Sequence, residues 1–212
     1  KLPKGIHTLD ELFAPANKGK IEVLTELRDT VGVIMLAQGV DITKFTKDQY
    51  FNALDFLQKK IADGFIRQVK GNDYKEDLIS GDAVAVIGWS GDAFQLAAEN
   101  DGKFAFAIPE SGGTISADNF IIPSTSKNKA NVEKLINYYY EPEVAAKVAA
   151  YVNYITPVQG AQAAMEKVDP TLVNNELIFP TAKTQSMLHV FRNLTPAEET
   201  EFTDAFQKAT GN

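Results

Sequence analysis

The chain has 212 residues, of which 44% are hydrophobic and 23% are charged, a composition typical of a soluble globular protein with one or two domains. Its formal net charge of −7 argues against nucleic acid or an anionic membrane as a partner and is compatible with a cationic ligand. Because the sequence contains no cysteine, disulfides, thiol catalysis and cysteine-ligated metals are excluded.

The first half of the chain alternates between predicted helices and short predicted strands. A capping box at Thr8 and Glu11 starts the first helix, and Thr46 caps a longer helix. In chain order we predict a helix to Phe13, a strand over 21–24, helices over 31–37 and 47–62, a strand over 65–69, a helix over 74–79, a strand over 83–89, a helix over 91–99 and a strand over 104–108.

The second half begins after Gly112 and Gly113, which mark a boundary. We predict a short buried strand over 119–122, helices over 131–140 and 143–152, short helices to about residue 173, and a last helix from Pro196 to about Ala209 that Thr195 caps. Strands that alternate with helices indicate an α/β architecture with mainly parallel pairing.

Signatures of enzymes are scarce in this sequence. Its two histidines, His7 and His189, are not in a metal-ligand spacing, and no nucleophile elbow, phosphate-binding loop or dinucleotide fingerprint occurs. We therefore predict no catalytic residue, no metal site and no cofactor. The enzymatic alternative is a hydrolase that works with carboxylates alone, which would need two acids around a sugar-sized cleft.

The segment Gly88–Asp92 carries the clearest signal for a ligand site. It follows an apolar run typical of a buried strand, and it contains Trp89, the only tryptophan of the chain. An aromatic ring beside a carboxylate suits an organic cation, because the ring face attracts the charge and Asp92 fixes one end of it. The alternatives are that Trp89 fills the core and that Asp92 caps the helix that follows.

Further carboxylates lie where predicted strands begin or end. Glu26 and Asp29 are three residues apart where a strand becomes a helix, so both can face one cleft; the alternative is compensation of the helix dipole. Asp118, with Ser116 two residues before it, precedes the predicted strand over 119–122 and could instead be a turn residue. Tyr154 lies in a loop at a predicted domain boundary, where proteins with two domains hold ligands.

Three adjacent tyrosines, 138–140, could ligate ferric iron. Within an amphipathic helix they are more typical of packing residues, because two of the three must face the interior or its margin.

The order of several short motifs resembles the bacterial spermidine/putrescine-binding proteins of ABC importers. These motifs are Leu24-Thr25-Glu26-x-x-Asp29, Gly88-Trp89-Ser90-Gly91-Asp92, Ser116-Ala117-Asp118-Asn119-Phe120-Ile121-Ile122-Pro123 and Tyr154-Ile155-Thr156-Pro157. The tracts 135–138, 142–145 and 178–180 fit as well, and the resemblance extends over essentially all 212 residues.

The resemblance implies an α/β fold of the type II periplasmic-binding-protein class, in which two lobes close on a ligand. Residues 1–113 and 158–212 match the second lobe, a parallel or mixed sheet flanked by helices, and 114–157 match a remnant of the other lobe, with crossing segments near 110–117 and 155–160. Most of the first lobe, the signal peptide and the lipid-anchor cysteine precede, in the family, the residue that matches Lys1. The implied protein is exported, and it is periplasmic or held at the cell surface by the parent's lipid anchor.

The resemblance also implies roles for the candidate residues. Trp89 matches the family's aromatic residue that packs on the methylenes of the polyamine, and Tyr154 matches the aromatic residue of the opposite wall. Asp92 matches a carboxylate found in putrescine-preferring members, and Asp118 matches an acid that holds an amine of the ligand. Either Glu26 or Asp29 matches the acid at the far end, and the position in the motif favours Asp29. Ser116 departs from the pattern, because the family usually has an aromatic residue there.

We therefore predict a protein that captures polyamines, putrescine or spermidine, for an ABC importer and acts without catalysis; its partner is a membrane permease and not nucleic acid. The segment 189–193 lacks the glutamine with which the family contacts spermidine. The alternative solutes are ferric iron, thiamine and betaine-like zwitterions. Without the first lobe, residues 114–157 would expose a strand edge and an apolar helix face, which predicts a homodimer or a complementing chain there.

Overall fold

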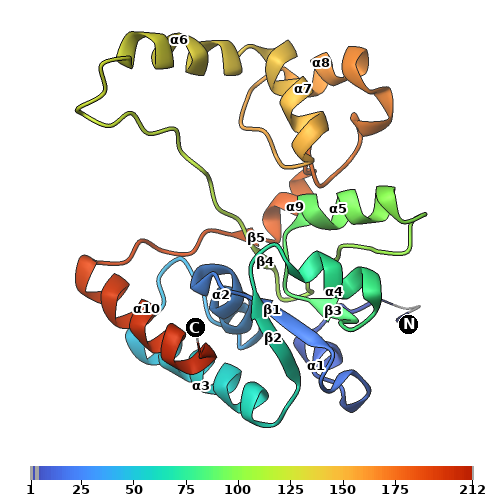
Figure 1. The fold of residues 1–212 in the computed structure, drawn as a ribbon, viewed down its shortest axis with the longest axis vertical. Coiled ribbons are helices and arrows are strands. Elements are labelled where there is room, and N and C mark those ends of the chain that lie inside the picture. The colour runs from blue at the N-terminus through green and yellow to red at the C-terminus, as the bar shows by residue number, and fades with distance from the viewer. Residues whose placement is uncertain (1, 3–4, 212) are drawn as a thin grey trace.

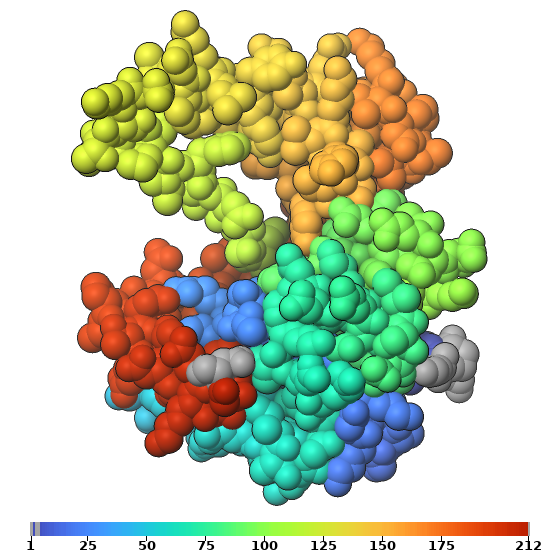
Figure 2. Space-filling model, viewed as in Figure 1, coloured from blue at the N-terminus to red at the C-terminus, as the bar shows by residue number. Residues whose placement is uncertain are grey.

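The structure is a computed structural model that describes residues 2 and 5–211, so the outer ends of the predicted lobe segments, Lys1 and Asn212, lie outside the described residues. Figure 1 shows a lower body that contains both termini and the strands, and an upper body that contains α6, α7 and α8. Extended segments join the two bodies, and the space-filling surface is hollowed between them beside the segment that leads to α6 (Figure 2).

The sheet of the lower body is built around β1 (Ile21–Leu24), which lies between β2 (Ile66–Lys70) and β3 (Ala85–Val86). Both pairs are parallel, and Ile21 pairs with Ile66 on one side and with Ala85 on the other. All of β1 is buried, as expected for a strand that is covered on both faces. The predicted α/β class with parallel pairing is confirmed.

The helices follow the sequence pattern closely. In chain order they are α1 (Leu9–Leu12), η1 (Pro15–Asn17), α2 (Leu27–Ala37), α3 (Lys47–Ala62), α4 (Tyr74–Ser80), α5 (Ser90–Glu99), α6 (Lys129–Tyr139), α7 (Pro142–Val152), α8 (Ala161–Val168), η2 (Pro170–Leu172), α9 (Ala182–Ser186) and α10 (Pro196–Thr210). The capping box predicted at Thr8 is formed, and the predicted caps Thr46 and Thr195 also make capping boxes, with Gln49 and Glu198. The helix predicted over 31–37 begins four residues earlier, because Leu27 is buried and extends its apolar face.

The last helix, α10, packs on α3 through aromatic rings. Tyr50 and Phe202 stack with 3.9 Å between ring centroids, and the Tyr50 hydroxyl donates a hydrogen bond to the Phe202 carbonyl at 3.1 Å. Both side chains are fully buried. This contact joins residues that are 152 positions apart and closes the lower body.

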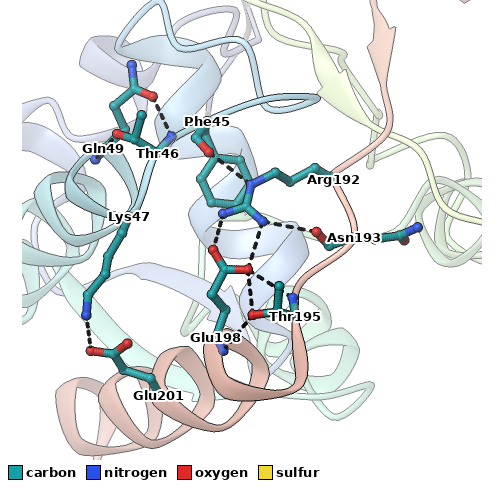
Figure 3. Close-up of polar contacts among 9 residues, drawn as sticks. All are labelled: Phe45, Thr46, Lys47, Gln49, Arg192, Asn193, Thr195, Glu198 and Glu201. Atoms are coloured by element: carbon teal, nitrogen blue, oxygen red, sulfur yellow. Dashed lines mark hydrogen bonds and ion pairs between the residues drawn. The ribbon is translucent and has the colours of Figure 1, made fainter.

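Arg192 fixes the segment before α10, as Figure 3 shows. Its guanidinium donates to the Phe45 carbonyl at 2.9 Å, lies over the Phe45 ring at 4.2 Å, and makes a bidentate pair with Glu198 at 3.1 and 2.6 Å. This pair and the capping bonds from Thr195 hold the pKa of Glu198 down at about 2. A separate ion pair, between Lys47 and Glu201, joins α3 to α10.

The upper body has a small core of its own. Five buried residues form it, and Phe94 of α5 packs against it from the lower body; the five are Ala146, Ala149, Met165, Leu172 and Ile178. The residues from 161 to 178 therefore lie beside α7, whereas the family resemblance groups 158–212 with 1–113. The lobe division itself stays a prediction; after this core the chain descends from the upper body to α9 (Figure 1).

Two predicted strands were wrong. Among the described residues, 104–108 and 119–122 form no strand, and the strand predicted over 83–89 is reduced to Ala85–Val86. An alternating pattern, as over 104–108, or a short apolar run, as over 119–122, becomes a strand only where a neighbouring strand accepts its backbone hydrogen bonds. The structure instead pairs β4 (Gly113–Thr114) with β5 (Leu188–His189) in parallel, which the sequence did not predict.

A buried acid, Glu22, lies in the middle of β1. Its side chain is fully buried, its Oε1 accepts a hydrogen bond from Arg67 at 3.1 Å, and its Oε2 has no partner among the described residues. Arg67 also pairs with Asp77 at 3.1 Å, and Lys70 pairs with the same Asp77 carboxylate. Burial and the adjacent Asp77 carboxylate raise the pKa of Glu22 to about 7.

This raised pKa predicts that stability falls as the pH rises. The unfolded chain releases the Glu22 proton near pH 4.5, whereas the folded chain holds it to about pH 7, so protonation of Glu22 favours folding. Between these values the free energy of unfolding of the wild type should fall by about 1–3 kcal/mol relative to Glu22→Gln, as measured by urea denaturation. Glu76→Gln, on the exposed face of α4, is the control. Parallel pH profiles for wild type and Glu22→Gln would contradict the assignment.

Candidate ligand-binding site

Asp29 lies in the first turn of α2, at the carboxyl end of β1. The indole nitrogen of Trp89 donates a hydrogen bond to its Oδ2 at 3.2 Å, and the Thr114 hydroxyl donates to its Oδ1 at 3.2 Å. Both donors are uncharged, so they orient the carboxylate without neutralising it. Asp29 therefore offers a fixed negative charge next to an indole ring.

Asp92 lies in the first turn of α5, which follows β3. Its side chain is buried, and the Tyr74 hydroxyl donates to its Oδ2 at 2.8 Å while Lys75 pairs with its Oδ1 at 3.4 Å. The Tyr74 hydroxyl also accepts a hydrogen bond from the backbone nitrogen of Trp89 at 3.2 Å. Burial and the bond to Asp92 raise the pKa of Tyr74, which therefore stays a proton donor.

These bonds connect the site into one network. The indole nitrogen of Trp89 donates to the Asp29 carboxylate. Its backbone nitrogen donates to the Tyr74 hydroxyl, which in turn donates to Asp92. The two carboxylates thus flank one aromatic residue at the carboxyl ends of adjacent parallel strands. In open α/β sheets this edge is where ligands bind.

Two glycines allow the close packing that this network needs. A Cβ on Gly32 of α2 would lie 2.7 Å from Cγ2 of Thr114, so glycine lets α2 approach β4 closely enough for Asp29 to meet the Thr114 hydroxyl. A Cβ on Gly91 would lie 2.5 Å from Cε2 of Tyr154. The Tyr154 ring therefore lies directly on the start of α5, next to Asp92.

Tyr154 connects this cluster to the upper body. Burial raises the pKa of its hydroxyl to about 12, and the nearby charges of Asp92 and, more weakly, Asp118 add to the effect. Asp118 is exposed on the extended segment that leads to α6. The charge of Asp118 is therefore close enough to act on the Tyr154 hydroxyl.

The remaining candidates lie outside the hydrogen-bonded network. Glu26 is the exposed residue before α2 and accepts a hydrogen bond from the Thr25 hydroxyl at 3.0 Å. Ser116 is exposed on the same extended segment as Asp118, and within the described residues no hydrogen bond joins it to the network. Three residues that the sequence did not single out, Tyr74, Lys75 and Thr114, take part instead.

The adjacent tyrosines lie on and just after α6, in the upper body. Tyr139 packs against Phe120 with ring centroids 5.2 Å apart and against Tyr140 at 5.5 Å. In the described part of the chain, no cluster of histidine, aspartate and glutamate is suited to hold a metal ion. Over the same residues, no helix combines the length and the apolar character that crossing a membrane requires.

Comparison with known proteins points to one family. The family of bacterial extracellular solute-binding proteins matches residues 1–180. The putrescine-binding periplasmic protein PotF of Escherichia coli is 26% identical over 96% of the chain, and the spermidine/putrescine-binding periplasmic protein of the same organism is 27% identical over 86%. A solved Listeria monocytogenes structure, assigned to a spermidine/putrescine ABC transporter, superposes with a TM-score of 0.85 at 27% identity and covers 98% of the chain.

The matches differ from this chain in length. The chain spans about half the length of the two Escherichia coli relatives, 56% and 51%, and 63% of the Listeria monocytogenes chain. The predicted type II periplasmic-binding-protein class is confirmed by this likeness, and so is the resemblance to polyamine-binding proteins.

The contact between Gly91 and Tyr154 predicts a pairwise effect on stability. Gly91→Ala should lower the free energy of unfolding by about 1–3 kcal/mol, because the new methyl group displaces the Tyr154 ring. In a Tyr154→Ala background the same change should be neutral or stabilising, since alanine favours the helix. Urea denaturation of the four proteins measures this cycle. An equal cost of Gly91→Ala in both backgrounds would show that the ring does not lie on α5.

Proposed function

The chain belongs to the bacterial extracellular solute-binding proteins, and from this membership we propose that it captures a polyamine, putrescine or spermidine, for import by an ABC transporter. The similarity to relatives named as binders of putrescine and spermidine supports this proposal. The observation that carries it is the network in which Trp89 joins the carboxylates of Asp29 and Asp92.

This network matches the chemistry of a polyamine. Such a ligand carries ammonium groups on apolar spacers, and a buried ammonium is costly unless a carboxylate faces it. We propose that Asp29 binds one ammonium group and that the Trp89 ring packs against the neighbouring methylenes. Asp92 offers a second carboxylate, and Glu26, exposed beside the site, contributes only long-range attraction.

The opposite wall of the site comes from the segments that lead to and from the upper body. We propose that Tyr154 and Asp118 close on the ligand from this side, with Ser116 at the rim; the influence of the Asp118 charge on Tyr154 supports their proximity. We propose a division into lobes in which 1–113 and about 181–212 form one lobe and 114–180 belong to the other.

Other functions are supported less well. Ferric iron would need the tyrosines of 138–140 in the site, but they lie on and after α6, where Tyr139 packs against Phe120 and Tyr140. The relatives compared above are named as binders of putrescine and spermidine, which supports neither thiamine nor a betaine-like ligand. We propose that the protein has no catalytic role, in keeping with a family that binds solutes.

We further propose a periplasmic or cell-surface location, a lipid anchor in the parent protein and an ABC permease as partner. A second copy or a complementing chain would cover residues 114–157, where several large apolar side chains are exposed. Leu135 is 66% exposed, Ile121 83% and Tyr151 83%. Large exposed apolar side chains are candidates for an interface, and these three lie on α6, on the segment before α6 and on α7.

The role of Asp29 predicts a loss of affinity. Asp29→Asn should weaken putrescine binding about 10–100-fold, because an ammonium group loses its counter-charge. Glu26→Gln removes the same charge three residues away and should weaken binding no more than about threefold. Titration calorimetry measures both, and the fluorescence of the single tryptophan provides a second readout. If Asp29→Asn binds as tightly as wild type, or Glu26→Gln has the larger effect, the proposed site is wrong.

The exposed apolar side chains of residues 114–157 predict that the chain associates with a second copy of itself. The chain should form a dimer whose fraction rises with concentration in light scattering, and Ile121→Asp should shift it toward monomer. Ile79→Asp, at a 53% exposed apolar residue on α4 of the lower body, is the matched control and should leave the dimer intact. A wild-type chain that remains monomeric at high concentration would contradict the homodimer.

A further inference from the structure

We infer that Lys75 is a specificity-determining residue, because its ammonium group occupies the cation position at Asp92 that a second ligand amine would use. The inference rests on the proposed function. It concerns how much each amine of a ligand adds to its affinity for the site.

The contacts of Asp92 show how the position is filled. Tyr74 and Lys75 are consecutive residues at the start of α4, and both direct a donor at the same carboxylate. Tyr74 takes Oδ2 at 2.8 Å and Lys75 pairs with Oδ1 at 3.4 Å. An ammonium group of a bound amine at Oδ1 would therefore meet Lys75 at the same oxygen.

The two carboxylates of the network differ in charge balance. Asp29 is held by an indole N–H and a hydroxyl, which leave its charge in place, whereas Asp92 is held by a hydroxyl and an ammonium group. A buried carboxylate needs such a partner, since burial of an unpaired charge is costly. The first carboxylate is open to a ligand cation, and the second is already neutralised from within the chain.

The pair between Lys75 and Asp92 is suited to exchange. Its 3.4 Å separation is longer than the 2.7–2.9 Å or so of a strong charge-assisted hydrogen bond. The Lys75 side chain is 33% exposed, so its ammonium group can turn to solvent, whereas Asp92 is only 10% exposed. A ligand amine can thus displace Lys75. The ion pair that the amine then forms with Asp92 replaces the pair between Lys75 and Asp92, so the net gain is small.

The consequence is weak discrimination at this end of the ligand. Putrescine should gain little from its second amine over butylamine, which has the same four-carbon chain and a single charge. The ratio of the two affinities therefore reports on Lys75, and it is insensitive to effects on the Asp29 end that both ligands share.

The test is titration calorimetry of putrescine and butylamine against wild type, Lys75→Gln and the control Lys44→Gln. Glutamine keeps a donor for the buried Asp92 without a charge, so Lys75→Gln should raise the putrescine-to-butylamine affinity ratio about tenfold. Lys44, 79% exposed and paired with Asp41, loses the same charge elsewhere, and Lys44→Gln should leave the ratio unchanged within about twofold.

A second pair of variants covers the case in which Lys75→Gln does not fold. In Asp92→Asn the unpaired Lys75 should repel the second amine, so putrescine should bind more weakly than butylamine. In the double variant Lys75→Gln/Asp92→Asn the two ligands should bind equally. An unchanged ratio in Lys75→Gln, or equal ratios in Asp92→Asn and the double variant, overturns the role of Lys75. Wild type and variants that all fail to bind either amine overturn the proposed function itself, and the role of Lys75 with it.

Discussion

The hydrogen bond from the Trp89 indole to Asp29 is the interaction on which the site depends. It fixes the plane of the ring and the direction of the carboxylate at once, and it joins residues that are 60 positions apart. The backbone nitrogen of the same residue binds the Tyr74 hydroxyl, which in turn holds Asp92. Trp89, at the start of α5, therefore sets the spacing of two carboxylates, of which Asp29 is open to a ligand cation and Asp92 is paired with Lys75.

This arrangement is possible because the backbone elements approach one another unusually closely. Gly32 lets α2 lie against β4, where Thr114 completes the hydrogen bonds of Asp29, and Gly91 lets Tyr154 lie on α5. The second contact couples the start of α5 to the loop after α7, so the site touches both bodies of the molecule. Arg192 meanwhile ties the segment that connects β5 to α10 to the Phe45 carbonyl and to Glu198.

Local signals in the sequence were sufficient for most helices. The capped starts at Thr8, Thr46 and Thr195 are formed because a cap and its partner lie within one turn. A strand forms only beside a partner strand, which a local pattern does not reveal. The strands predicted over 104–108 and 119–122 are therefore absent, and the pairing of β4 with β5 was not predicted. For the same reason the sequence pointed to Trp89 and Asp92 but not to Lys75, which meets Asp92 only because the fold brings the starts of α4 and α5 together. The roles of the candidate residues in binding a ligand stay predictions.

The most direct test of this account is a crystal structure of the chain with putrescine bound. The account predicts one ammonium group within hydrogen-bond distance of the Asp29 carboxylate and the methylenes against the Trp89 ring. Putrescine bound elsewhere, or at Asp92 alone with Asp29 still occupied only by Trp89 and Thr114, would contradict it.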